Sequence, residues 1–352
     1  ANNFGSRSTG ANQGVFVFNA INPSGIGDSV SVNAIVSDGS QYVQSAYSLP
    51  VSRDGLRMGA SATFLGYRNV SSYVSPNGGY GNAWTAGLSA AYPLLRKQGT
   101  NLNATLNYDV KNYTNKLISD FSVISAYTIN NTTLGLSGNH YDSFGGGGIS
   151  AGSVSVVLGN LNISSSSIGF DQPNPALRFG ANTPANFSKV TFSGNRNQQL
   201  SAAGTTTAYI GVNGQLASVD LNSAEQFYLG GPYGVRAYPV AQGGGSQGGI
   251  ATAELRHQFP DRVQVSVFFD AGLVQQFKNP SAFLQGLTNA PNTYSLMGTG
   301  LGVKWDWQGW NLGATIAWKV GTNPLYTQTG RPVDTDGTNI NPRGWVTASY
   351  QF

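Results

Sequence analysis

The chain contains no cysteine, only two histidines and few charges, and it has no long apolar run. Without cysteine, disulfide scaffolds and thiolate metal sites are excluded, as suits a chain that passes through an oxidising compartment. Charged residues make up 10% of the 352 residues, against roughly 25% in an ordinary soluble domain. No segment approaches the ~18 consecutive apolar residues of a transmembrane helix. A helical membrane protein is therefore excluded.

Sites for metals, cofactors and nucleic acids are also missing. The two histidines, His140 and His257, are too few for a histidine metal cluster. The net charge is +4, and no lysine or arginine cluster resembles a nucleic-acid footprint. The stretch 243–248 satisfies both G-x-G-x-x-G and G-x-S-x-G, but no predicted helix follows it, as either motif requires. The stretch 334–337 could hold Ca²⁺, although a polar turn is favoured. We expect no enzyme, no metal and no cofactor.

Glycine and aromatic residues are abundant instead. The chain has 47 glycines, 11% aromatic residues and a mean hydropathy of −0.17. In a transmembrane β-barrel, lipid-facing and lumen-facing residues alternate, so the average hydropathy stays near zero. The first residues, 1–4, contain neither a basic nor an apolar leader segment. We therefore expect either a processed chain or a fragment.

Three segments alternate between apolar and mostly polar or small residues with period 2, which predicts strands with two different faces. They are 29–37, 102–111 and 310–320. In the second segment the apolar face carries Leu102, Ala104, Leu106, Tyr108 and Val110, and the polar face carries Asn103, Thr105, Asn107, Asp109 and Lys111. A soluble sandwich also alternates in this way. However, the polar faces hold small residues as well as charges, as a hydrated lumen permits.

Aromatic residues favour the membrane barrel over the sandwich. Trp310 and Trp318 bracket one apolar face, and eight residues of tilted strand cover roughly 20 Å along the membrane normal, near the spacing of the two aromatic girdles. The final strand places Val346, Ala348, Tyr350 and Phe352 on one face and ends in an aromatic residue. Such an ending resembles the C-terminal assembly signal of bacterial outer-membrane barrels.

Strand-plus-connector units average about 22 residues, which predicts about sixteen antiparallel strands. We expect residues 1–352 to form a single transmembrane β-barrel domain. Tight turns are predicted at 260–262 and 306–309. Four long connectors are predicted, and we expect them on the extracellular side: 164–187, 216–248, 276–293 and 322–342.

The connector 216–248 is of special interest because loops of this length are usually functional or disordered. It carries Val235, Arg236, Ala237 and Tyr238, and a glycine-rich run follows. Alternation on the next two strands turns Glu254 and Asp270 toward the lumen. If the loop folds back into the lumen, Arg236 reaches these carboxylates. The alternative is that both carboxylates merely line a wet lumen and Arg236 lies in solvent.

Four stretches together resemble the two-partner secretion transporters (TpsB), a branch of the superfamily that includes the barrel-assembly and chloroplast-import channels. Residues 2–10 look like the opening of that family's barrel, and residues 22–28 like its first hairpin turn. Residues 221–238 resemble its sixth extracellular loop. Phe268, Asp270 and Gly272 match its F-x-D-x-G strand motif.

This resemblance implies that Arg236 pairs with Asp270, with Glu254 as a further member of the ion pair. The family has glycine where this chain has Ala237. Glycine tolerates positive φ, which alanine adopts at a cost of roughly 1 kcal/mol, so the geometry of the loop tip stays open. Family members also carry periplasmic POTRA domains before the barrel, and no such segment is present here. We expect this chain to form a pore without selecting cargo.

The resemblance further implies an outer-membrane pore that exports one large unfolded β-helical exoprotein, such as an adhesin, a haemolysin or a toxin, without nucleotide hydrolysis. Further expected partners are outer-membrane lipid and, during biogenesis, the barrel-assembly machinery. A monomer is expected. Two alternatives remain: an insertase or assembly factor of the same superfamily, and a diffusion porin. A porin has no need of a thirty-residue loop matched to an F-x-D-x-G strand.

Overall fold

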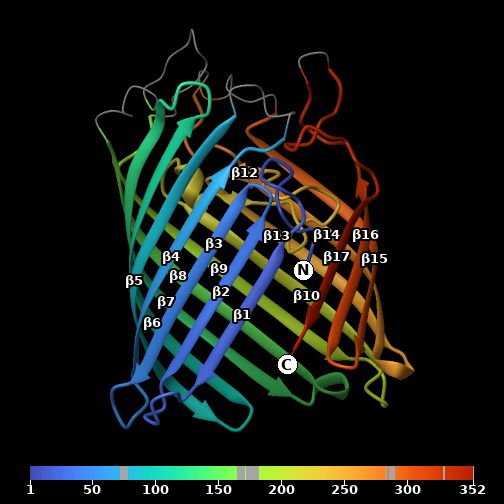
Figure 1. The fold of residues 1–352 in the computed structure, drawn as a ribbon. Coiled ribbons are helices and arrows are strands. Elements are labelled where there is room, and N and C mark those ends of the chain that lie inside the picture. Colours follow the sequence, from blue (N-terminus) through green and yellow to red (C-terminus); the bar gives the residue numbers. More distant parts are fainter. Residues whose placement is uncertain are drawn as a thin grey trace.

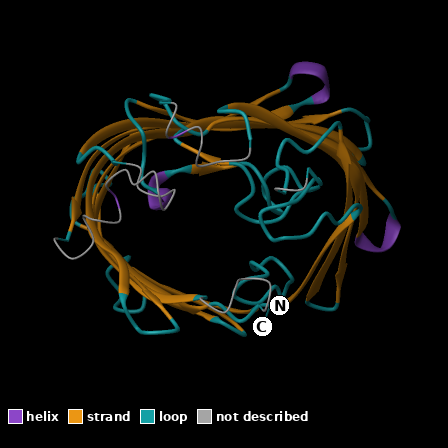
Figure 2. Ribbon diagram, turned by 90° about the horizontal axis from the view of Figure 1, so that it is seen from above, coloured by secondary structure: helices purple, strands orange, loops and turns teal. Residues whose placement is uncertain are grey.

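The computed structural model describes residues 1–352 except 72–77, 165–170, 172–181, 282–283, 285–289, 328–329 and 352. The described residues form one antiparallel sheet of fifteen strands and a separate two-stranded ladder. The large sheet curls into a barrel (Figure 1), and viewed from above it makes an oval ring with loops inside it (Figure 2). No helix in the described part of the chain combines the length and the apolar character needed to span a membrane.

Each strand of the large sheet pairs with its neighbours in chain order, apart from the two short strands β11 and β12. The bounds are β1 Gly14–Ile21, β2 Ser29–Ser37, β3 Ser40–Pro50, β4 Arg57–Arg68, β5 Gly79–Lys97, β6 Thr100–Leu117, β7 Val123–Asp142, β8 Gly148–Ile163, β9 Asn186–Gln199, β10 Thr206–Ala217, β11 Phe227–Tyr228, β12 Gly244–Gly245, β13 Gln247–Gln258, β14 Val263–Gln275, β15 Thr293–Trp307, β16 Trp310–Val320 and β17 Arg343–Tyr350. Three short 3-10 helices complete the list: η1 Phe144–Gly146, η2 Ser223–Glu225 and η3 Pro260–Arg262.

The predicted alternating segments are strands. Two of them, 29–37 and 310–320, coincide with β2 and β16, and the third lies inside β6. On β14, Val267, Phe269 and Leu273 lie on the outer face and are exposed, at 47%, 42% and 55%. Their neighbours Phe268 and Asp270 are buried inside the ring. Alternation therefore assigned the faces correctly, because successive strand residues point to opposite sides of a sheet.

From β8 onward, short and long connections alternate between the two ends of the barrel, whereas in the first half the connections 38–39 and 118–122 at the second end are also short. At one end each connection has seven residues or fewer, as at 259–262 and 308–309. Gln308 and Gly309 both have positive φ, as a two-residue hairpin turn requires. At the other end lie the long connections 164–185, 218–246, 276–292 and 321–342, which confirms the four predicted connectors to within two residues.

The strand count differs from the prediction by one. The described residues give fifteen laddered strands, and β1 and β17 share no ladder. Between these two edges lies Asn2, which forms isolated antiparallel bridges to both Gln13 and Thr347. The backbone of Ala1 also exchanges hydrogen bonds with Ala348. Residues 1–3 thus lie between the two edge strands and are bonded to both sides without forming a ladder.

The connection 218–246, called loop 6 below, is more ordered than the sequence suggested. Strands β11 and β12 pair its two legs into a short stem. We call residues 229–243 beyond this stem the tip, and residues 218–226 with Ser246 the base. Within the tip, the Val235 amide donates to the Leu229 carbonyl, and the Gly231 amide donates to that of Tyr238. The regular structure of loop 6 is limited to η2, β11 and β12, and backbone hydrogen bonds between its legs order the rest of the tip.

Two apolar clusters hold loop 6 against the inner wall. The first joins Leu229, Val235 and Tyr238 of the tip to residues such as Phe268 and Leu296 on the wall. The second joins Leu221 of the base to six wall residues, Tyr127, Ile129, Val157, Leu161, Phe187 and Ala217. The buried core of this barrel is therefore made by a loop packing inside the ring, at two separate places.

Candidate functional site

The loop 6 tip brings Arg236 onto the carboxylates of the inner wall. Its Nε lies 2.8 Å and its Nη2 2.7 Å from the two oxygens of Asp270, which makes a bidentate pair. Its Nη1 lies 2.6 Å from Oε1 of Glu254. The Arg236 side chain is 13% exposed, against 9% for Glu254 and 0% for Asp270. One arginine thus joins two carboxylates in a largely water-free place, where charge-assisted pairs are strong and directional.

The carboxylate of Asp270 is fully satisfied by donors. Besides the two guanidinium contacts, it accepts the backbone N–H of Arg236 at 3.1 Å and the hydroxyl of Thr252 at 2.9 Å. Thr252 lies directly opposite Asp270 in the ladder of β13 and β14. A buried charge is costly unless it is paired and hydrogen-bonded in this way. Three of the four hydrogen bonds that stabilise the buried Asp270 carboxylate thus come from loop 6, and one comes from the wall.

Glu254 is shared between two arginines. Its second oxygen lies 2.6 Å from both Nε and Nη2 of Arg256, two residues along β13. Arg256 stacks over the ring of Tyr209 at 4.3 Å, and among the described residues it forms no ion pair with Asp270. Glu254 therefore pairs with both the loop arginine Arg236 and the wall arginine Arg256, whereas the ion pair of Asp270 is with Arg236.

Aromatic residues enclose the guanidinium and the neighbouring backbone. The Arg236 guanidinium carbon lies 3.3 Å from the ring centroid of Phe268, a cation–π contact. Trp345 of β17 donates its indole N–H to the Arg236 carbonyl at 2.7 Å. Phe4 packs edge-on against Trp345 and Tyr233. The tip is thus in contact with β13 and β14, with β17 and with the N-terminal segment.

The seat of the tip is lined with glycine. A Cβ built on Gly298 would lie 2.7 Å from the Cβ of Ala237, and one on Gly272 would lie 3.1 Å from Val235. Ala237 is 1% exposed and is not among the described residues with positive φ. The difference from the family pattern is accommodated by close approach to Gly298 and needs no left-handed backbone. Gly272 of the strand motif likewise provides room for the tip.

The far leg of the tip is held by the connection between β16 and β17. The amide and hydroxyl of Thr335 both donate to the side-chain oxygen of Gln242. Asp334 pairs with Lys319 at 2.8 Å and with Arg343 at 3.2 Å. These pairs occupy the stretch considered for Ca²⁺, and no cluster of potential metal ligands is found in the described residues.

Tyr238 completes the tip motif. It is 0% exposed, and the Lys319 ammonium lies 5.1 Å from its ring centroid. Burial, followed by the charge of Asp334, raises the pKa of Tyr238 to about 12. The hydroxyl therefore stays protonated at physiological pH, and the residue acts as a packing anchor.

Two polar cavities flank the Arg236 cluster. One, of about 320 Å³, lies toward β9 and β10, and the other, of about 330 Å³, lies toward β15 to β17. Arg236, Glu254 and Arg256 line both cavities. Cavities of this size with polar lining residues can hold several waters.

A second charge cluster at the base of loop 6 was not predicted. Glu225 pairs with Lys111 of β6 at 2.7 Å and with Lys189 of β9 at 2.8 Å. Burial by itself would raise the pKa of the Glu225 carboxyl, but the two ammonium groups outweigh it and lower that pKa. The sequence shows that Lys111 faces inward, but no local signal connects it to a glutamate 114 positions away.

The predicted assembly signal is described only in part. Tyr350 is the last residue of β17, is 51% exposed and packs against Trp310 at 5.2 Å between ring centroids. Phe352 lies outside the described residues. The Trp310–Tyr350 contact is consistent with an aromatic girdle at that end of the wall.

Known proteins with solved structures share this fold. CdiB from Escherichia coli matches 99% of this chain and 61% of its own at a TM-score of 0.74 and 17% identity. CdiB from Acinetobacter baumannii matches 99% of this chain and 57% of its own at 0.69 and 18% identity. BamA from Haemophilus ducreyi lacking POTRA domains 1–3 matches 97% of this chain and 68% of its own at 0.63 and 13% identity. These likenesses show the fold, an antiparallel outer-membrane barrel.

Sequence comparison gives the family. The heme/hemopexin transporter protein HuxB of Haemophilus influenzae is 26% identical over 290 residues, which is 80% of this chain and 48% of the relative. The chain thus spans about half the length of the curated relatives it matches. A family model described as haemolysin secretion/activation protein ShlB/FhaC/HecB matches residues 1–305. That family consists of outer-membrane secretion proteins for partner exoproteins and not of enzymes. The chain belongs to the haemolysin secretion/activation protein family ShlB/FhaC/HecB.

Proposed function

We propose that residues 1–352 are a single barrel domain that serves as the translocation pore of a two-partner secretion transporter. The pore exports one large, unfolded, β-helical exoprotein, such as an adhesin, a haemolysin or a toxin, without nucleotide hydrolysis. The observation that carries this proposal is the loop 6 tip, held inside the ring by Arg236 between Glu254 and Asp270. A loop held this way can occupy the lumen at rest and exchange its contacts during export.

The two cavities beside the cluster support a releasable contact. A bidentate arginine pair is strong when water is excluded, but Arg236 is still 13% exposed and borders both cavities. Water and polar backbone of a passing chain can therefore replace the carboxylates. We assign the resting hold to the motif residues Val235, Arg236, Ala237 and Tyr238 on the loop and Phe268, Asp270 and Gly272 on the wall, with Glu254 as the third charged member.

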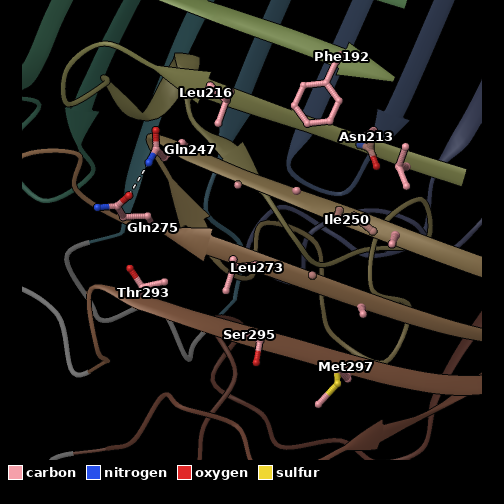
Figure 3. Close-up of a pocket in the computed structure, with 16 residues that line it drawn as sticks. Phe192, Asn213, Leu216, Gln247, Ile250, Leu273, Gln275, Thr293, Ser295 and Met297 are labelled. Carbon is pink, nitrogen blue, oxygen red and sulfur yellow. Dashed lines mark hydrogen bonds between the residues drawn. The ribbon is translucent and has the colours of Figure 1, made fainter. Parts of the chain in front are cut away.

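We further propose outer-membrane lipid as the partner of the outer face. A groove of about 620 Å³ lies there over β9, β10, β13, β14 and β15 (Figure 3). Apolar side chains, among them Phe192, Leu216 and Leu273, line it, and a hydrogen bond between Gln247 and Gln275 lies at one end. The groove is outside the ring, so it does not belong to the translocation path. The barrel-assembly machinery during biogenesis and a monomeric state complete the proposal.

The proposal predicts a specific export defect. The full-length parent should restore export of its partner exoprotein in a strain that lacks the transporter. A variant with residues 218–246 replaced by a short glycine–serine turn should insert into the membrane but reduce the exported protein at least about tenfold, because the lumen then lacks the loop that responds to the passenger. Immunoblots of medium and periplasm measure the effect.

Three outcomes contradict the proposal in different ways. Normal export without loop 6 removes the loop from the mechanism. Steady wide conductance that does not depend on residues 218–246, together with no export by the parent, indicates a diffusion porin. Faster folding of unrelated barrels in its presence, again without export, indicates an insertase.

A further inference from the structure

A second anchor of loop 6 lies at its base, away from the Arg236 cluster. Glu225, at the end of η2, is 3% exposed and directs its carboxylate at three wall residues. One oxygen accepts from Lys111 at 2.7 Å and from Asn131 at 2.9 Å, and the other lies 2.8 Å from Lys189. These partners come from three different strands, β6, β7 and β9.

The backbone of the base is fixed by the same neighbourhood. The Glu225 carbonyl accepts from Lys189 and from the side-chain amide of Gln215, each at 2.9 Å. The Gln215 amide also donates to the Ser246 carbonyl, at 3.0 Å. Gln215 therefore ties the two legs of the loop together where they leave the wall, and Glu225 ties that junction to the wall.

The two anchors have opposite polarity and lie on different parts of the wall. At the base a loop carboxylate meets wall ammonium groups, whereas at the tip a loop guanidinium meets wall carboxylates. In the sheet, β10 separates β9 with Lys189 from β13 with Glu254, and five strands separate β6 with Lys111 from β14 with Asp270. Each anchor also has its own apolar cluster. Since the two anchors share no wall residue, breaking one leaves the contacts of the other in place.

We infer that Glu225, with Lys111 and Lys189, is an independent anchor that keeps the base of loop 6 on the wall when the tip is released. Loop 6 then moves about its base. Release of Arg236 lets the tip move and opens the lumen, while the base stays bound to the wall through Glu225. Glu225 is a positioning residue, because it acts on export only through the loop. The role in export rests on the proposed function, but the anchoring does not.

The absence of cysteine from residues 1–352 simplifies the test, and any cysteine elsewhere in the full-length transporter is first replaced by serine. Single cysteines at Val235 in the tip and at Ser246 in the base both start from 0% exposure. Each is introduced into the full-length transporter, and the rate of labelling by a water-soluble methanethiosulfonate reagent is measured. Heat-modifiable migration in gels verifies that every variant is a folded barrel.

We expect Arg236→Ala to speed labelling at Val235→Cys at least about tenfold and to leave labelling at Ser246→Cys unchanged, because local openings follow the contacts that close them. We expect Glu225→Gln to speed labelling at Ser246→Cys at least about tenfold and to leave labelling at Val235→Cys unchanged. Asp306→Asn is the control: this carboxylate lies on β15, is exposed and forms no ion pair within the described residues. It should change neither rate.

Glu225→Gln leaves two ammonium groups unpaired and could misfold. In that event the neutral triple variant Glu225→Gln, Lys111→Met, Lys189→Met replaces it, with the same expected result. If Arg236→Ala exposes Ser246→Cys as much as Val235→Cys, the loop moves as one body and the inference is wrong. Protection of Ser246→Cys in the triple variant would also overturn it. The labelling rates do not depend on export. They therefore test the anchoring even if the proposed function is wrong.

Discussion

Replacing Arg236 with alanine is expected to abolish most export while leaving the barrel assembled. Asp270 is 0% exposed and would lose two of its four hydrogen bonds, the two guanidinium contacts, keeping only those from Thr252 and the loop amide. Breaking a buried pair by removing one partner costs about 3–5 kcal/mol. The docked state of the tip is therefore strongly disfavoured. Exported partner protein in the medium should fall at least about tenfold, which corresponds to 1.4 kcal/mol.

Arg256→Ala is the matched control for this experiment. Arg256 contacts the same Glu254 at 2.6 Å, but it lies on the wall and leaves the Arg236–Asp270 pair intact. Export by this variant should stay near that of the parent. Equal defects in the two variants would mean that general loss of positive charge in the lumen matters and that the loop arginine has no special part.

The second large effect is expected from a single methyl group at Gly298. A Cβ there would lie 2.7 Å from the Cβ of Ala237, and neither atom belongs to a side chain that can rotate away. Overpacking of this kind typically costs about 1–3 kcal/mol. Gly298→Ala should therefore displace the tip and lower export about five- to a hundredfold in the same immunoblot assay.

The same position offers a rescue and a control. Combining Gly298→Ala with Ala237→Gly removes the opposing methyl group, so export should return toward that of the parent. Gly302→Ala, on the same strand and face, meets the rotatable Ser266 hydroxyl instead and should have little effect. If the double variant is as defective as Gly298→Ala, the clash with Ala237 is not the cause of the defect.

Alternation was enough to predict much of the site. A period of 2 turned Glu254 and Asp270 to the same inner face, and the length of the connector made contact with Arg236 possible. The family resemblance then selected Asp270 as the main partner, and the structure places the two side chains 2.7 Å apart. The inward faces depend only on local sequence and so could be predicted from it, whereas the choice of partner needed the resemblance.

Contacts across the lumen could not be predicted in the same way. Alternation gives the face of Lys111 but not its height or its position around the ring, which depend on the register of every hairpin between β6 and loop 6. The pairing of Gln242 with Thr335 has the same origin, since 93 positions separate them. The contact between Ala237 and Gly298 could not be predicted, because a glycine in a strand does not reveal which backbone approaches it.

The reversed charges at the two ends of loop 6 also bear on how the barrel is completed during folding. If the tip settled at the site of the base, Arg236 would meet Lys111 and Lys189, and if the base settled at the site of the tip, Glu225 would meet Glu254 and Asp270. Both contacts would be repulsive. The charges of loop 6 therefore favour the seating that the structure shows.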